Sequence, residues 1–150
     1  DGFQGDAAIS VGVGSVSDEV VTLITATEKS LAAGIATAKV GKQLGDVGAA
    51  IQTFAETRGY NVVREYAGHG IGREMHEDPS VPNYGRPGSG ALLKKGMTLA
   101  LEPMLNMGTW RTRVGGDAWT VSTKDGSLSA HFEHTIAITD GEAEVLTVAR

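Results

Sequence analysis

The hydrophobic period changes once along this chain, and that change limits the folds open to it. Up to about residue 58, apolar residues recur at steps of three and four, as in amphipathic helices. From residue 60 onward, short runs rich in Val, Ile, Thr and aromatic residues indicate strands instead. Two helices followed by several strands, without regular alternation, favour an α+β fold over a doubly wound sheet. A mixed α/β sandwich is the alternative architecture.

Two helices are predicted before residue 60. Either Ser15 or Ser17 can cap the first helix, which runs to about Lys39. The second helix begins near Leu44 and ends at Arg58, because a basic last turn followed by glycine is a regular helix stop.

The strand signals are short and irregularly spaced. The predicted strands are residues 60–66, 97–104, 119–123, 133–139 and 144–148. Another strand, residues 7–13, follows a glycine-containing turn at residues 1–6, so a strand partner is expected before residue 1. Residues 79–90 hold three of the four prolines and are predicted to form a long irregular loop.

Composition narrows the function classes. The 150 residues, with 41% hydrophobic and 21% charged side chains, are expected to form one globular domain. A net charge of −5, with no basic stripe, argues against direct nucleic-acid binding. The absence of cysteine excludes disulfides and thiolate metal sites. Neither a bilayer-spanning apolar run nor a signal peptide is recognisable, so we expect no membrane association and a cytoplasmic location.

Five residues capable of metal chemistry occur in separate segments marked by glycine or proline. They are Asp6, His69, His76, Glu102 and Glu133. Three carboxylates and one imidazole would form a hard, oxygen-rich site that suits Mn²⁺, Fe²⁺, Co²⁺ or Zn²⁺ and differs from a closed structural zinc site. The sequence therefore predicts metal catalysis.

Each candidate also has a purely structural interpretation. His69, flanked by glycines, lies close to a metal or substrate, or else in a turn. His76 lies too far along the chain to form a one-turn helical pair with it and fits a surface histidine as well. Glu102 in an apolar run is costly if buried without a cation, but it could face water from an edge strand. Asp6 could be a turn aspartate, and Glu133 could occupy a solvated face.

Several motifs in order along the chain carry a family resemblance. They are Gly-His-Gly-Ile-Gly at 68–72, Met-His-Glu-Asp-Pro at 75–79, Leu-Lys-Lys-Gly-Met-Thr-Leu-Ala-Leu-Glu-Pro-Met-Leu-Asn at 93–106, Trp-Thr-Val at 119–121 and Ala-His-Phe-Glu-His-Thr-Ile at 130–136. Together with the turn at residues 1–6, they resemble the bacterial type I methionine aminopeptidases. The motif Glu-Pro-Met-Leu at 102–105 resembles that of these enzymes more than the Glu-Pro-Gly motif of the related prolidases.

This resemblance implies a pita-bread fold, in which two similar α+β halves hold a dinuclear metal centre. Residues 1–150 would then be one catalytic domain that is incomplete at its N-terminus, comprising the C-terminal half and the end of the N-terminal half. The implied activity is removal of the N-terminal methionine from nascent proteins. The family is usually monomeric.

The resemblance also implies roles for the metal-binding residues. Asp6 and Glu133 correspond to bridging carboxylates, and His69 and Glu102 to ligands of the first metal, with Glu102 also the proton shuttle. In the family a further metal-binding aspartate and a substrate-facing histidine lie upstream of this turn. We therefore expect this polypeptide to bind one metal ion better than two.

The substrate side is implied in the same way. His76 corresponds to a histidine that hydrogen-bonds the substrate or the tetrahedral intermediate, and Trp119 to a wall near the methionine pocket. Met75 stands where a phenylalanine usually lines that pocket, and its flexible thioether can contact a methionine side chain. The two alternatives are a pita-bread module that binds peptides or proteins without catalysis and a peptidase that cuts before proline.

Overall fold

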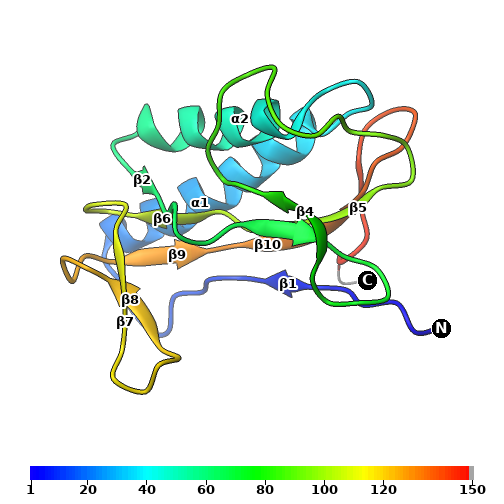
Figure 1. Cartoon of the computed structure of the whole chain (residues 1–150). Helices are drawn as coiled ribbons and strands as arrows, with labels where there is room; N and C mark the ends of the chain where they lie inside the picture. Colours follow the sequence, from blue (N-terminus) through cyan, green and yellow to red (C-terminus); the bar gives the residue numbers. More distant parts are fainter. Residues whose placement is uncertain (149–150) are drawn as a thin grey trace.

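The computed structural model describes residues 1–148, with two helices packed on one face of an antiparallel sheet (Figure 1). Helix α1 spans Asp18–Thr37, and its first turn is capped by Ser17 Oγ, which accepts a hydrogen bond from the backbone N–H of Val20 at 3.4 Å. Helix α2 spans Leu44–Glu56. Its start is stabilised by Asp46, whose carboxylate accepts from the backbone N–H of Gln43 at 2.8 Å. Both helices predicted from the sequence are confirmed.

The strands form one large sheet and two small ones. In the large sheet the order is β1 (Ala7–Ala8), β10 (Glu133–Ala137), β5 (Thr98–Leu101), β3 (Gly68–Gly70) and β4 (Glu77–Val81), and β11 (Glu144–Val145) also pairs with β10. A second sheet joins β2 (Asn61–Val62), β6 (Met104–Asn106) and β9 (Ser129–His131), and a separate hairpin joins β7 (Thr112–Val114) and β8 (Val121–Thr123). All these pairings are antiparallel.

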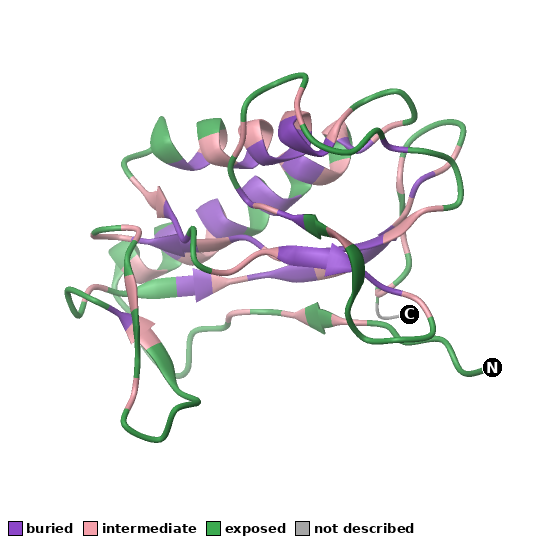
Figure 2. Cartoon of the chain, in the orientation of Figure 1, coloured by how far each residue is buried: buried purple, intermediate pink, exposed green. Residues whose placement is uncertain are grey.

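The hydrophobic core lies between the helices and the large sheet (Figure 2). Leu101 of β5 and Ile136 of β10 are buried against Leu31 of α1 and Ile51 of α2. The two helices approach closely at Gly34, where an added Cβ would lie 2.8 Å from Ile51 Cδ1. Because side chains alternate along a strand, the residues between these apolar positions face away from the helices.

Most predicted strands occur, but several of their boundaries were wrong. The run predicted at 97–104 is two strands, because the chain leaves the large sheet at Glu102 and Pro103, and proline has no N–H for a ladder. The strands predicted at 7–13 and 60–66 shorten to residues 7–8 and 61–62, and the loop predicted at 79–90 begins inside β4. Strands β3, β4, β7 and β9 were not predicted.

Neither helix in the described part of the chain combines the length and the apolarity needed to cross a bilayer.

Candidate metal centre

The predicted ligands lie in or directly next to four neighbouring strands, on the face of the large sheet opposite the helices. Ala8 pairs with Glu133, so Asp6, two residues before Ala8, projects on the same side of the sheet. His69 pairs with Ala100, and Glu102 lies two residues beyond Ala100, so both also share this side. The antiparallel register thus gathers side chains that lie far apart in the sequence.

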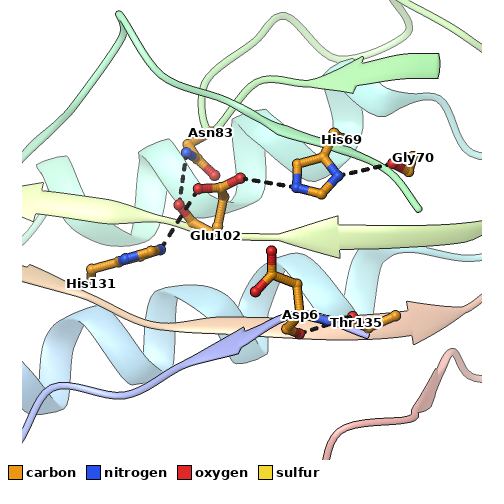
Figure 3. A network of polar contacts seen from close by, with 7 residues as sticks. All are labelled: Asp6, His69, Gly70, Asn83, Glu102, His131 and Thr135. Carbon is orange, nitrogen blue, oxygen red and sulfur yellow. Dashed lines mark hydrogen bonds and ion pairs between the residues drawn. The ribbon is translucent and has the colours of Figure 1, made fainter. Parts of the chain in front are cut away.

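The ligand atoms meet within metal-binding range. Asp6, His69 and Glu133 each offer one ligand atom, and these atoms all lie within 4.8 Å of one another. Glu102 joins them, because its Oε1 lies 3.7 Å from Nε2 of His69 (Figure 3). The structure therefore brings together the four residues that the sequence predicted as ligands.

Burial separates these side chains from ordinary surface residues. Only 8% of His69 and 5% of Glu133 are exposed, and Asp6 and Glu102 are half-buried. The interpretations of His69 as a turn residue and of Glu133 as a solvated one are therefore wrong. So is the edge-strand interpretation of Glu102, since β5 lies between β10 and β3.

The glycines around His69 have a structural cause in the sheet itself. A Cβ at Gly68 would overlap the carbonyl oxygen of Ala100 in β5, and one at Gly70 would overlap that of Asp78 in β4. Strand β3 is thus packed so closely between its neighbours that only glycine fits on either side of the histidine. The glycines thus allow this close approach of three strands.

Backbone contacts orient the ligands. Nδ1 of His69 lies 2.9 Å from the carbonyl oxygen of Gly70, to which it donates in the Nδ1–H tautomer, leaving the lone pair of Nε2 facing Glu102. Asp6 is fixed by Thr135, whose hydroxyl accepts from the Asp6 N–H at 2.8 Å and donates to the Asp6 carbonyl at 2.9 Å. Asn83 Nδ2 donates to the backbone carbonyl of Glu102 at 3.1 Å. These contacts are the outer layer that a metal ligand set requires.

Electrostatics show that the cluster is suited to a cation. Burial raises the pKa of Glu133 to about 8, with further contributions from the charges of Glu102 and Asp6. Burial also raises the pKa of Glu102 to about 7, although His69 lowers it and Asp6 raises it further. Oε1 of Glu133 is buried without a hydrogen-bond partner. Because crowded, buried carboxylates are stabilised by a nearby positive charge, these residues fit a divalent metal ion.

The predicted substrate-side residues lie at varying distances from this cluster. The ring of exposed His76 lies against that of His69, with centroids 4.3 Å apart, and both line a pocket of about 440 Å³ with Glu77 and Asp78. Met75, 39% exposed, is not part of that pocket's lining. Trp119 is 87% exposed on the loop between β7 and β8, and the structure does not bring it into contact with the four ligands. The roles of these three residues stay predictions.

Sequence reasoning missed one residue at the site. His131, at the end of β9, places Nε2 3.8 Å from Oε2 of Glu102 (Figure 3). Burial lowers the pKa of His131, and the charge of Asp6 opposes that effect, so the imidazole is favoured in its neutral form. The signal that could have found it is the two-residue spacing from Glu133, which places both side chains on the same face. His134 has the opposite parity and packs toward the helix side, where it lines a pocket with Leu31.

The chain has an α+β fold whose large sheet gathers three carboxylates and an imidazole on one face. This arrangement is typical of proteins that hold a divalent metal ion. The model of metallopeptidase family M24 matches residues 1–140, and the chain belongs to that family.

Similarity to individual proteins is also high. The chain is 51% identical over 147 residues to a methionine aminopeptidase of Clostridium acetobutylicum. The matched region covers 98% of this chain and 59% of that relative. It superposes on the crystal structure of a methionine aminopeptidase from Thermotoga maritima with a TM-score of 0.96 at 51% identity, over 99% of this chain and 59% of that one. The chain thus spans about three fifths of the length of these relatives.

A more distant comparison concerns the fold alone. The prolidase from Pyrococcus furiosus superposes with a TM-score of 0.75 at 21% identity, over 100% of this chain and 39% of that chain. The fold class expected from the sequence is confirmed: the described part of the chain has the α+β pita-bread architecture over the portion that it shares with its relatives.

Proposed function

We propose that this chain is the metal-binding part of a methionine aminopeptidase, which hydrolyses the first peptide bond of substrates that begin with methionine. The observation that carries the proposal is the convergence of Asp6, His69 and Glu133 within 4.8 Å, with Glu102 beside them. The 51% identity to methionine aminopeptidases supports this substrate over one cut before proline. The N-terminus of a peptide or nascent protein would be the partner, in the cytoplasm.

Asp6, His69, Glu102 and Glu133 would hold the metal. Their mixture of oxygen and imidazole ligands accepts Mn²⁺, Fe²⁺, Co²⁺ or Zn²⁺. A divalent ion bound there would supply Lewis acidity toward a peptide carbonyl and an acidified water as nucleophile at neutral pH. We expect residues 1–150 to act as a single domain. With these four ligands, we also expect that domain to bind one ion better than two.

The chain's own groups would move the protons and orient the peptide. The carboxylate of Glu102 would be both a ligand and the group that takes up and releases a proton. His76 lies exposed beside His69 at the pocket of about 440 Å³, where its imidazole can donate a hydrogen bond to a substrate carbonyl. Trp119 and Met75 remain proposed contacts for the methionine side chain.

The test is hydrolysis of Met-Gly and Xaa-Pro peptides by the chain with Mn²⁺ or Co²⁺, run beside a Glu102→Ala variant. Cleavage of the Met-Gly peptide that disappears in the variant would support the proposal. Cleavage restricted to the Xaa-Pro peptide would replace it with a prolidase-like activity. A folded, metal-loaded chain that binds peptides without cutting either would instead favour the non-catalytic binding module.

The number of metal ions needs its own experiment. Calorimetric titration of the metal-free chain with Mn²⁺ is expected to show one site that binds more tightly than any other. Two equally tight sites would contradict the expectation of a preferred single ion, without affecting the proposed substrate.

A further inference from the structure

Glu102 lies between two imidazoles, and only one of them belongs to the proposed ligand set. Its Oε1 faces Nε2 of His69 at 3.7 Å, and its Oε2 faces Nε2 of His131 at 3.8 Å (Figure 3). Nε2 of His131 is buried and has no hydrogen-bond partner. A buried donor or acceptor without a partner is costly, so this nitrogen calls for an explanation.

The backbone holds His131 firmly in this position. Its N–H donates to Ser10 Oγ at 3.0 Å, and Ser10 Oγ donates in return to the His131 carbonyl at 2.8 Å. On the other side, β9 pairs His131 with Met104, two residues beyond Glu102. The segment after β1 and strand β6 therefore fix the main chain of His131 from both sides, with its imidazole toward Glu102.

We propose that His131 is a positioning residue of the metal centre, whose Nε2–H donates a hydrogen bond to Oε2 of Glu102 when a cation is bound. This inference rests on the proposed metal site. A carboxylate with two free oxygens can bind a cation through either oxygen or both, whereas a donor on one oxygen leaves the other as the ligand. His131 would thus reserve Oε1 of Glu102 for the cation shared with His69.

The distances suit this role. A hydrogen bond to a carboxylate has a donor–acceptor distance of about 2.8 Å, so the gap to Oε2 must close by about 1 Å. We expect a small rotation of the Glu102 carboxylate, as Oε1 turns toward the cation, to close this gap.

The test is Co²⁺ binding to the chain, followed by calorimetry and by visible absorption of the bound ion, for wild type, His131→Gln and His131→Leu. An amide can donate the same hydrogen bond, but it is a poor ligand compared with imidazole. We expect His131→Leu to weaken Co²⁺ binding by about 10-fold or more, as loss of an outer partner of a ligand does. His131→Gln should stay within about 3-fold of wild type, with unchanged Co²⁺ absorption bands.

A matched control comes from a second histidine nearby. His134→Gln makes the same substitution on the helix side of the sheet. There Nδ1 of His134 lies 2.9 Å from Thr147 Oγ1. We expect this variant to bind Co²⁺ as tightly as the wild type. The side chain of His131 is 37% exposed, and His131→Ala replaces the leucine variant if the latter does not fold.

Four results would overturn the inference. Unchanged affinity in the leucine or alanine variant would show that His131 does not position Glu102. An equal loss in the glutamine variant would rule out the donor role, and altered absorption bands there would make His131 a direct ligand. Failure of the wild-type chain to bind Co²⁺ would overturn the proposed metal centre as well, which distinguishes this result from the other three.

Discussion

Carboxylates in two regions of this molecule have opposite surroundings. On the site face of the large sheet, burial raises the pKa of Glu102 to about 7 and that of Glu133 to about 8. In the turns next to β7 and β8, hydrogen bonds from Thr120 and Trp119 lower the pKa of Asp117 to about 2, and those from Thr109 and Ser127 lower that of Asp125 further. The same chemical group is thus destabilised in one region and stabilised in the other.

The difference lies in the donors that surround each group. Asp125 accepts from the backbone N–H groups of Thr109 at 2.6 Å and of Ser127 at 3.0 Å, while it remains exposed to water. Glu133 is buried and leaves Oε1 without a partner. The turn aspartates therefore serve the fold directly, whereas the site glutamates reduce the stability of the metal-free chain. A bound cation would supply the charge that the site lacks.

The largest effect is expected from Glu133→Gln. The neutral amide removes the crowded charge, so metal affinity should fall by about 100-fold or more while the free energy of unfolding of the metal-free chain rises by about 1 kcal/mol at about pH 9. Calorimetry with Mn²⁺ and urea unfolding in EDTA measure the two quantities. A variant less stable than wild type without metal would contradict the comparison.

The stability of the metal-free chain should fall as the pH rises, because of the two glutamates of the site. Because the pKa values of Glu102 and Glu133 are higher in the folded chain than the ordinary 4.5, their contribution to stability is complete below about pH 4.5 and is lost as the pH rises through about 7 and 8. Urea unfolding in EDTA should therefore show falling stability from about pH 5 to about pH 8.5. Saturating Mn²⁺ should reduce the fall, since the cation binds the ionised form. A rise in stability over this range would show that the two carboxylates are not destabilised.

Asp125→Ala is expected to have a smaller, opposite effect. Removing the acceptor leaves the N–H groups of Thr109 and Ser127 without this partner, so the Tm should fall by a few degrees at neutral pH. The pKa of Asp125 is lowered only in the folded chain, so the wild type gains stability from this carboxylate above about pH 4. The difference in stability between the variant and the wild type should therefore shrink only below about pH 4. Metal affinity should not change, and a variant that binds Mn²⁺ poorly would show that the two regions are coupled.

The smallest effect is expected from Asp117→Ala. Asp117 accepts from the backbone N–H groups of Trp119 at 3.1 Å and of Thr120 at 2.9 Å, within a hairpin that forms its own two-stranded sheet. The global Tm should therefore change little, while amide exchange in residues 115–120 accelerates. Trp119 fluorescence during peptide binding would then test whether this loop reaches the substrate, as the sequence predicted.

The parts of the fold that sequence reasoning predicted are those with local signals. Both helices follow from caps and periodicity near Ser17 and Leu44, which depend on residues a few positions apart. Strand β3 could not be predicted in this way, since Gly-His-Gly has weak strand preference and its conformation is set by β4 and β5 on either side. The break after β5 depends on Pro103.

The candidate site divides similarly. Asp6, His69, Glu102 and Glu133 lie in motifs that can be recognised along the chain, and the structure brings them together. His131 lies in the same motif as Glu133, but nothing in that motif indicates its relation to Glu102, which arises from the pairing of β9 with β6. Long-range register of this kind cannot be obtained from periodicity alone.

The position of Asp6 has a further consequence for the chain as a polymer. Strand β1, only two residues long, delivers this ligand to a cluster completed by β10, and the Thr135 hydroxyl that fixes Asp6 lies 129 residues away in the sequence. A cation held by Asp6 and Glu133 would therefore act as a reversible cross-link that closes a loop of most of the chain. Like a disulfide over a long loop, such a link would restrict the unfolded chain and tie the first residues to the last strands.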